Sequence, residues 1–253
     1  LTPMLETIIA RKKDQLIKNR AAQKQRALAF KTALQAPGLT LIAEVKQASP
    51  SQGLIAPDFD PVALATRYQE AGAGALSVLT ETDFFKGHPD HLMAVIQKTN
   101  LPILRKDFII EPIQLYESVY LGASAVLLMA ACLSPEKLDT MAMIADDIGL
   151  VPLIEIHTET ELYTSLSIVK KLGCPLGINN RNLKTLVVDT QTALALYAVA
   201  RTELGRHTIL IAESGYTQAS ELDTLDATGF NGVLIGTGLV TYPDLATYFT
   251  KRL

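Results

Sequence analysis

The chain has 253 residues, of which 48% are hydrophobic and 19% charged, and its formal net charge is -3. Such a composition is typical of a globular protein with a large core, and the weak negative charge argues against nucleic acid as a partner. No apolar run approaches the roughly 20 residues that span a bilayer, so we expect a cytoplasmic protein without membrane contact. The length matches a single α/β barrel, which routinely has ~250 residues.

The cysteines and histidines indicate no metal site. Cys132 and Cys174 each lie in an apolar stretch, without the Cys or His spacing of a metal or redox motif. We therefore expect two buried thiols in a reducing compartment. The four histidines are scattered, and His157 is expected to be a hydrogen-bonded structural group rather than a ligand. We expect neither a metal nor a cofactor.

The first 39 residues predict a helical extension. Ile8, Ile9 and Leu16 recur at helical spacing, and we expect this segment to pack on the barrel that follows or over its mouth. From Thr40 onward, short β-branched or Leu-rich runs alternate with longer runs of helical period. Eight candidate strands are TLIAEVK from Thr40, ALSVLT from Ala75, PILRKDF from Pro102, AVLLMAA from Ala125, VPLIEIH from Val151, PLGINN from Pro175, TILIAES from Thr208 and GVLIGTGL from Gly232.

Amphipathic runs between these strands, such as PVALATRYQEAG and TQTALALYAVARTELG, predict helices, and several of them end at Gly. Buried strands that alternate with helices require a parallel sheet, and eight such units close into a barrel. We therefore predict an α/β fold: one (β/α)8 TIM barrel over residues 40–253, with residues 1–39 as its extension. A doubly wound open sheet is less favoured, since it usually has fewer strands and a Gly-rich turn after the first.

Ionisable residues recur on the inward faces of alternate strands. The period of two places Glu44 and Lys46 on one face, and it points Lys106 inward while Arg105 and Asp107 face the helices. Because alternate strands of such a barrel contribute to a common layer, we expect one cluster at the carboxyl ends. Its predicted members are Glu44, Lys46, Lys106, Glu155 and Glu213. An ion pair in the core explains any one of them, but not all five together.

Further polar residues follow the later strands. Asn179, Asn180, Arg181 and Asn182 follow the sixth strand and predict a substrate-orienting amide and a guanidinium at the mouth. Barrels of this kind often bind phosphate with Gly-rich loops after the last two strands. The candidates are Ser214 and Gly215 after the seventh strand, Gly236, Thr237 and Gly238 after the eighth, and Ser49, Ser51 and Gly53 in the first loop.

Apolar residues at strand ends are candidates for walling an aromatic ring. They are Phe84, Phe85, Phe108, Leu127, Leu183 and Leu186. Core packing explains each leucine equally well.

The strings AEVKQASPSQG, SVLTETDFFKG, PILRKDF, LIEIH, GINNRNL, AESG and LIGTGL resemble the indole-3-glycerol phosphate synthase family, in order and at its spacing. The resemblance implies cyclisation of 1-(2-carboxyphenylamino)-1-deoxyribulose 5-phosphate to indole-3-glycerol phosphate, with loss of carbon dioxide and water. It further implies a cytoplasmic, cofactor-free lyase of tryptophan biosynthesis, expected to be a monomer, with association with other enzymes of that pathway left open.

The resemblance assigns roles by position. Lys106 matches the catalytic lysine, Lys46 the cation that holds the substrate carboxylate, and Glu155 the second catalytic residue. Glu44 lies beside Lys46. The remaining matches are Asn179 and Glu213 as supporting catalytic groups, Arg181 for substrate, and Ser49, Ser214, Gly215, Gly236 and Thr237 for phosphate. Which lysine donates which proton stays open.

Two rival functions remain from the residues alone. Another phosphate-binding barrel enzyme is one: a phosphoribosyl-anthranilate isomerase uses a Cys and an Asp, and a sugar-phosphate aldolase uses a Schiff-base lysine. The other is a catalytically silent barrel that binds a phosphorylated ligand or a protein. Such a barrel tolerates the loss of its carboxylates, yet all of them are present here.

Overall fold

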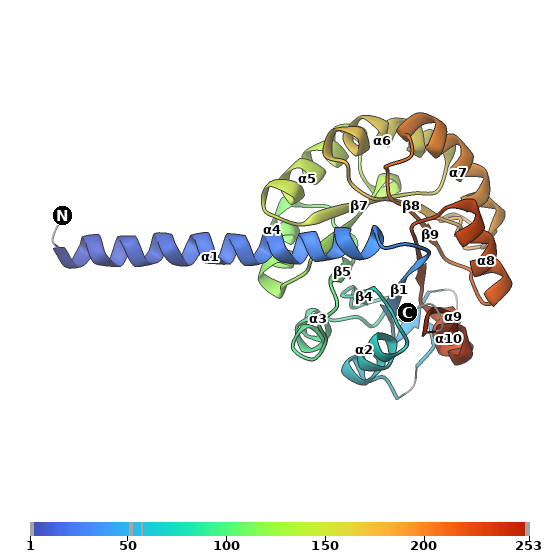
Figure 1. Cartoon of the computed structure of the whole chain (residues 1–253), viewed down its shortest axis with the longest axis horizontal. Helices are drawn as coiled ribbons and strands as arrows, with labels where there is room; N and C mark the ends of the chain where they lie inside the picture. The colour runs from blue at the N-terminus through green and yellow to red at the C-terminus, as the bar shows by residue number, and fades with distance from the viewer. Residues whose placement is uncertain (1–2, 51–52, 57, 251–253) are drawn as a thin grey trace.

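The computed structural model describes residues 3–50, 53–56 and 58–250, and it is a barrel from which one long helix projects (Figure 1). Each predicted strand is present, mostly one or two residues shorter than its sequence run. The barrel strands are β1 (Thr40–Val45), β4 (Ala75–Leu79), β5 (Ile103–Lys106), β6 (Ala125–Met129), β7 (Val151–Ile156), β8 (Leu176–Asn179), β9 (Leu210–Glu213) and β10 (Gly232–Ile235).

The sheet closes on itself in the order β1-β10-β9-β8-β7-β6-β5-β4, and all neighbours are parallel. The (β/α)8 prediction is therefore confirmed, and the open doubly wound sheet is excluded because β1 pairs with both β4 and β10. The register sets Leu79 beside Lys106, Met129 beside Glu155 and Asn179 beside Glu213. Polar groups from different strands are thereby brought to one end of the barrel.

A helix follows each barrel strand, with local capping signals at both ends. The Asp60 carboxylate accepts from two backbone N–H groups at the start of one helix, and Thr158 caps another. The helices are α2 (Pro61–Glu70), α3 (Pro89–Ile96), α4 (Pro112–Leu121), α5 (Pro135–Asp147), α6 (Glu159–Leu172), α7 (Gln191–Leu204), α8 (Ala219–Thr228), α9 (Thr237–Thr241) and α10 (Thr247–Thr250), with short 3-10 turns η1 (Ala130–Cys132) and η2 (Pro243–Ala246).

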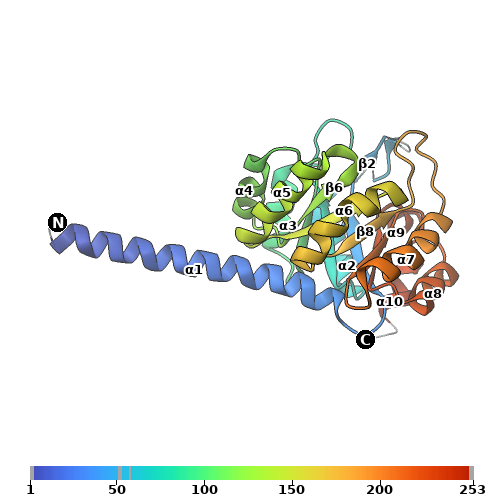
Figure 2. The same ribbon diagram turned by 90° about the horizontal axis from the view of Figure 1, so that it is seen from above.

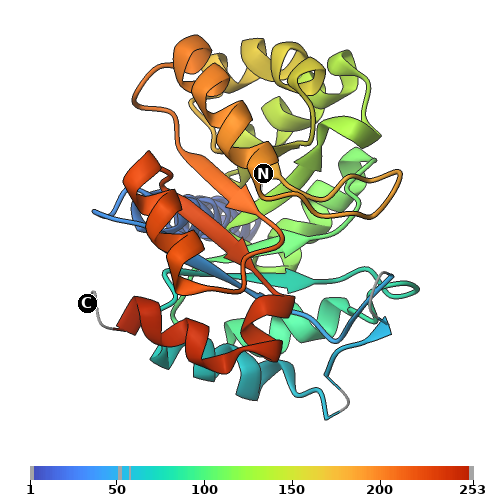
Figure 3. The ribbon, with the colours of Figure 1, turned by 90° about the vertical axis from the view of Figure 1, so that its right-hand side faces the viewer.

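The last strand is shorter at its carboxyl end than the sequence predicts. GVLIGTGL continues only to Ile235, and the chain then turns into α9, with Gly236 as its N-cap. At the opposite end of the sequence, a small hairpin of β2 (Ala48–Ser49) and β3 (Gly53–Leu54) follows β1. It lies at the same end of the barrel as the long loop after β8 (Figures 2 and 3).

Two apolar cores hold the barrel together. One fills the lumen with inward side chains such as Ile42, Leu104 and Ile211, and the other lies between the strands and the surrounding helices. The lumen core also includes Phe30 and Leu34, which come from the N-terminal helix and are fully buried. The lumen is thus closed at the amino ends of the strands, and only the carboxyl ends stay open for a ligand.

The N-terminal extension forms one helix, α1 (Pro3–Leu34), which lies across the end of the barrel opposite the β2–β3 hairpin (Figures 2 and 3). Its later part packs on the barrel: Gln23 donates hydrogen bonds to the carbonyls of Ala123 and Gly149. The expectation that Ile8, Ile9 and Leu16 pack on the barrel or over its mouth is wrong. All three are exposed, because the first half of α1 projects beyond the barrel.

No helix in the described part of the chain is both long enough and apolar enough to cross a membrane.

Candidate active site

A cavity of about 370 Å³ opens at the carboxyl ends of the strands. This is the end of the barrel at which the prediction placed the site, and the volume lies in the range of small-molecule pockets. The predicted site residues that line it are Glu44, Lys46, Ser49, Phe84, Phe85, Lys106, Phe108, Leu127, Glu155, Asn179, Arg181, Leu183, Leu186 and Ser214.

Lys106 lies between two buried carboxylates, of which Glu155 lines the cavity with it and Glu213 does not. Its Nζ is 3.4 Å from Oε2 of Glu155 and 3.9 Å from Oε2 of Glu213. These residues come from β5, β7 and β9, so alternate strands do deliver them to one level. Both carboxylates are almost completely shielded from solvent.

Burial and neighbouring charges shift the pKa values of Lys106, Glu155 and Glu213 in different directions. Burial works against the Lys106 ammonium, but Glu155, Glu213 and Glu44 outweigh it and raise the lysine pKa. Burial also opposes ionisation of Glu155, yet Lys106 and His157 hold the pKa of that carboxyl well below its usual range. Burial and the adjacent Glu155 charge raise the Glu213 pKa well above normal. The group therefore combines an ammonium, an ionised carboxylate and a carboxyl group that keeps its proton to a higher pH than usual.

Glu44 and Lys46 form a second ion pair on the wall of the cavity. Lys46 Nζ is 2.6 Å from Oε1 of Glu44. Burial raises the pKa of Glu44, but the neighbouring Lys46 and Lys106 charges lower it by more, so the carboxylate is ionised. A Cβ on Gly236 would come too close to Glu44 Oε1 and Lys46 Nζ, so a larger residue there would displace the ends of both side chains.

The loop after β8 is held by its own amides. Asn179 Oδ1 accepts from the Arg181 backbone N–H, and the Arg181 guanidinium donates to the Leu186 carbonyl. Asn180 points away from the cavity and binds the Ser214 carbonyl, the Tyr216 hydroxyl and a backbone N–H of α7. Asn179 and Arg181 therefore face the cavity, whereas Asn180 fixes the loop.

The predicted phosphate-binding residues are only partly gathered at the cavity. Ser49 and Ser214 line it, and the buried Ser49 hydroxyl has no hydrogen-bond partner among the described residues. Ser214 and Gly215 have positive φ angles of 70° and 95°, which turn the chain sharply after β9. Gly215, Gly236 and Thr237 do not line the cavity as described, and Ser51 lies outside the described residues.

Apolar side chains surround the cavity entrance. Phe85 and Phe108 approach with ring centroids 6.3 Å apart. Leu183 and Leu186 are 41% and 42% exposed, so core packing does not explain them, whereas Leu127 belongs to the lumen core and is 2% exposed. An exposed apolar rim beside a charged floor suits a ligand with an aromatic part.

The sequence interpretation missed Glu81 and misplaced Cys132. The Glu81 carboxylate accepts from the backbone N–H groups of Asp83, Phe84 and Phe85, and it thereby shapes the loop that carries the two phenylalanines. An acidic residue just before a turn was the available signal.

Cys132 is exposed and lines the cavity rather than being buried, because it lies in the η1 turn after β6. Cys174 is buried as expected.

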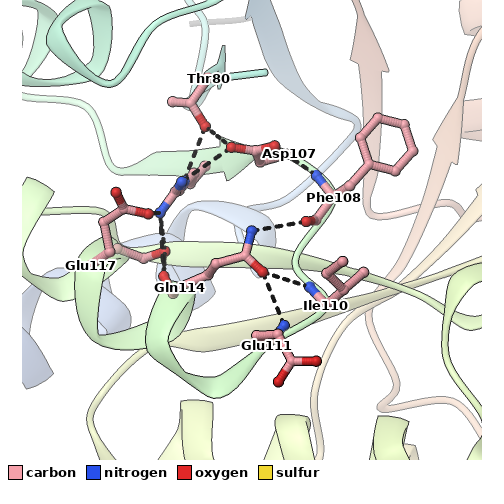
Figure 4. Close-up of polar contacts among 9 residues, drawn as sticks. Thr80, Asp107, Phe108, Ile110, Glu111, Gln114 and Glu117 are labelled. Atoms are coloured by element: carbon pink, nitrogen blue, oxygen red, sulfur yellow. Dashed lines mark hydrogen bonds and ion pairs between the residues drawn. The ribbon is translucent and has the colours of Figure 1, made fainter. Parts of the chain in front are cut away.

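The loop after Lys106 is fixed from behind. Arg105 faces the helices, as predicted, and contacts Thr80, Asp107 and Glu117 there. Gln114 of α4 accepts from the Ile110 and Glu111 N–H groups and donates to the Phe108 carbonyl (Figure 4). The residues on both sides of Lys106 are therefore held by bonds that do not involve the cavity.

His157 follows β7 and contacts two carboxylates. Its Nε2 lies 3.3 Å from Glu155 Oε1, and its Nδ1 lies 3.3 Å from Glu161 Oε2. Burial alone would lower its pKa, but the bonds and charges of the two glutamates raise the pKa of His157 to about 9. It is a hydrogen-bonded group, as expected, but it also contacts the site.

Comparisons with known proteins agree on one family. The family model described as indole-3-glycerol phosphate synthase matches residues 4–253. A protein of that name from Chlorobium chlorochromatii is 45% identical over 213 residues, which are 83% of this chain and 80% of that protein. Another of that name from Chloroherpeton thalassium is 41% identical over 230 residues, 91% of this chain and 86% of that protein.

A solved structure of phosphoribosylanthranilate isomerase from Thermotoga maritima is also similar. The TM-score is 0.58, with 12% sequence identity over 85% of this chain and 97% of that chain. At this identity the likeness supports the barrel fold alone.

Proposed function

Because the chain belongs to the indole-3-glycerol phosphate synthase family, whose members are carboxy-lyases of tryptophan biosynthesis, we propose that this cavity closes the indole ring. The substrate is 1-(2-carboxyphenylamino)-1-deoxyribulose 5-phosphate. The observation that carries the proposal is the Lys106 ammonium between the ionised Glu155 and Glu213, whose raised pKa favours its protonated form. Ring closure and dehydration both need proton transfers, and these groups supply donors and an acceptor.

Ring closure begins at the substrate ketone. The ring carbon that bears the carboxylate attacks the ketone carbon, and the ketone oxygen takes a proton from Lys106. The raised pKa of Lys106 keeps it charged until that step, so its ammonium stabilises the developing alkoxide. Phe108 follows Lys106 in the chain and, with Phe85, forms a wall for the aromatic ring.

Decarboxylation then restores the aromatic ring. Before it, the substrate carboxylate is held by Lys46, whose position on the cavity wall is fixed by Glu44 at 2.6 Å. Carbon dioxide leaves from the carbon that formed the new bond, and its bonding electrons return to the ring. Glu44, paired with Lys46, limits the net positive charge there. This favours the change from a bound carboxylate to neutral carbon dioxide.

Dehydration completes the indole. Glu155, ionised and 3.4 Å from Lys106, takes a proton from the methylene carbon, while the hydroxyl group leaves as water after protonation. Glu213, whose raised pKa favours its protonated form, keeps a proton near Lys106, and Asn179, beside it in the sheet, orients the substrate hydroxyl. Arg181 is assigned to the substrate from its place on the cavity wall.

The phosphate is proposed to bind at the loops after β9 and β10. The unpartnered hydroxyl of Ser49, the backbone of Ser214 and Gly215, and Gly236 with Thr237 provide neutral donors there. Leu183 and Leu186, exposed without a ligand, would cover the aromatic part of the substrate, and Leu127 lies beneath it.

The rival barrel chemistries fit less well. A Schiff-base lysine needs a lowered pKa, whereas the carboxylates raise that of Lys106. An isomerase site would need a free Cys and Asp, but burial and two glutamates raise the Cys132 pKa and Asp107 is bound to Arg105 and Thr80. A silent binding barrel would not need the Lys106 cluster.

The test is to incubate the purified protein with the substrate and follow indole fluorescence. Lys106→Ala and Glu155→Ala are each expected to lower kcat by about 10²–10⁴, the usual contribution of a positioned acid or base. Lys137→Ala is the control, because Lys137 pairs with Glu111 at the surface. No product from a folded wild type contradicts the assignment. Borohydride trapping with substrate, expected to label nothing, tests the aldolase alternative.

We further propose that the chain folds as one domain and works in the cytoplasm as a monomer, without metal or cofactor. Proton transfers and charge positioning suffice for the chemistry above, which supports the last point. Size-exclusion chromatography with light scattering tests the monomer. Co-purification with the other enzymes of tryptophan biosynthesis tests their association.

A further inference from the structure

His157 links the cavity to the outside of the barrel. Its Nε2 lies 3.3 Å from Oε1 of Glu155, and its Nδ1 lies 3.3 Å from Oε2 of Glu161 on α6. The second oxygen of Glu155 is 3.4 Å from Lys106 Nζ. Four groups that bind and release protons therefore form one continuous chain, with no step longer than 3.4 Å.

The two ends of this chain have different surroundings. Lys106 and Glu155 line the cavity at the barrel mouth. His157 instead lines a shallow surface depression between β7, α6 and the start of α7, together with Thr158, Glu159 and Asp189. The Glu161 side chain is 21% exposed, whereas that of Glu155 is 1% exposed. The chain thus runs from a dry floor to solvent without passing through the mouth.

The proposed reaction takes up one proton per turnover. The ketone oxygen gains one proton in ring closure, and the hydroxyl group gains a second when it leaves as water. The methylene carbon releases one proton to Glu155. Because the carboxylate departs as carbon dioxide without a proton, the protein has lost one proton when the product is complete.

The mouth is a poor route for this proton while the product is bound. The cavity of about 370 Å³ is of the size that one such ligand fills, and its rim carries Phe85, Phe108, Leu183 and Leu186. Apolar side chains around a bound aromatic product exclude water.

We propose that His157 and Glu161 form a proton relay that recharges Glu155 and Lys106 from solvent through the side of the barrel. This rests on the proposed function. His157 gives its Nε2 proton to Glu155, and Glu155 passes a proton to Lys106. The neutral ring, which still carries its Nδ1 proton, then rotates so that this N–H group faces Glu155, and the bare Nε2, now on the Glu161 side, takes a proton from solvent. No bond other than N–H and O–H changes in the relay.

The charges around His157 suit this role. Glu155 on β7 and Glu161 on α6 face its two nitrogens, Glu159 and Asp189 line the depression outside, and Lys106 lies beyond Glu155. The two facing glutamates overcome the effect of burial and raise the imidazole pKa to about 9, so the proton to be delivered is present at neutral pH.

His157→Gln separates relay from bracing, because glutamine can donate a hydrogen bond to Glu155 but cannot pass a proton on. We expect kcat at pH 7 to fall about tenfold, less than the 10²–10⁴ of a direct proton-transfer group. Added imidazole is expected to restore most of that loss in a saturable manner, with little change in KM. His207→Asn, which alters an exposed histidine, is the control for general effects and for imidazole itself.

Glu161→Gln provides a second test that keeps His157 and therefore does not depend on the fold of the first variant. Removing this charge is expected to lower the His157 pKa, which NMR of the imidazole nitrogens measures. It is also expected to shift the alkaline limb of the pH profile of kcat to lower pH. The relay is overturned if kcat is unchanged in His157→Gln, or if imidazole does not restore the loss. It is also overturned if the alkaline limb of the pH profile of kcat is unshifted in Glu161→Gln. A wild type that makes no product contradicts the proposed function instead.

Discussion

The carboxyl group of Glu213 lies 3.9 Å from the ammonium of Lys106, yet its pKa is raised well above the usual range. Burial and the negative charge of Glu155 raise its pKa by more than Lys106 lowers it. An ion-pair distance alone therefore does not identify the charged partner of Lys106.

Glu213→Gln is expected to stabilise the protein near pH 7. The folded-state pKa of Glu213 is raised, so between the ordinary value of 4.5 and that raised pKa the unfolded state binds fewer protons, and stability falls as pH rises. Glutamine removes this fall. Denaturant titrations should show a gain in the free energy of unfolding at pH 7 and none at pH 4. Equal curves for both proteins at pH 7 would contradict a raised Glu213 pKa.

Lys46→Met is expected to destabilise the protein most at neutral pH. Glu44, buried and 2.6 Å away, has a lowered pKa, so its contribution to stability is present above the unfolded-state value and lost as pH falls through the folded pKa. Without Lys46 an unpaired buried charge remains, which costs about 3–5 kcal/mol.

The double variant Lys46→Met with Glu44→Gln is the matched control for this pair. It is expected to recover much of the loss in stability, because no charge is left unpaired, while activity stays low for want of the substrate cation. Thermal unfolding at pH 7 and pH 4 measures both effects, and a double variant as unstable as the single one argues against the pair.

Gln114→Ala is expected to lower kcat/KM although Gln114 does not line the cavity. Its side chain binds the Ile110 and Glu111 N–H groups and the Phe108 carbonyl, and so fixes the loop after Lys106 (Figure 4). The stability loss should be about 1–3 kcal/mol. Gln69→Ala, which removes a side-chain bond to the Asn100 N–H far from the mouth, should cost some stability without changing kcat/KM.

Deletion of residues 1–19 is expected to leave the free energy of unfolding nearly unchanged, because residues 4–19 are exposed and this part of α1 projects beyond the barrel, whereas Arg20 pairs with Asp147 of α5 (Figure 1). Phe30→Ala, later in the same helix, should cost about 3–5 kcal/mol, since Phe30 is fully buried in the lumen core. Chemical denaturation of the two variants measures the contrast. A large loss on deletion would show that the exposed half does contact the barrel in solution.

The alternation of apolar strands and amphipathic helices was enough to predict the barrel. A strand buried on both faces must be apolar almost throughout, so a charge within it is conspicuous, and Lys106 and Glu155 were found in this way. The period of two further separated Lys106 from Arg105, because neighbouring side chains point to opposite faces. These inferences depend only on distances along one strand, which backbone geometry sets.

Groups that act through space were not open to the same reasoning. Glu161 and His157 meet Glu155 only because α6 packs against β7, and Glu81 acts on N–H groups whose direction the turn decides. The prediction of how α1 packs was wrong for the same reason. The helical spacing of Ile8 and Leu16 shows which face is apolar but not whether a partner covers it. The sequence therefore determined the barrel and the residue types at its mouth. Only tertiary structure decided the protonation of Glu213 and the position of His157, because burial and charge–charge distances exist only once the strands have closed.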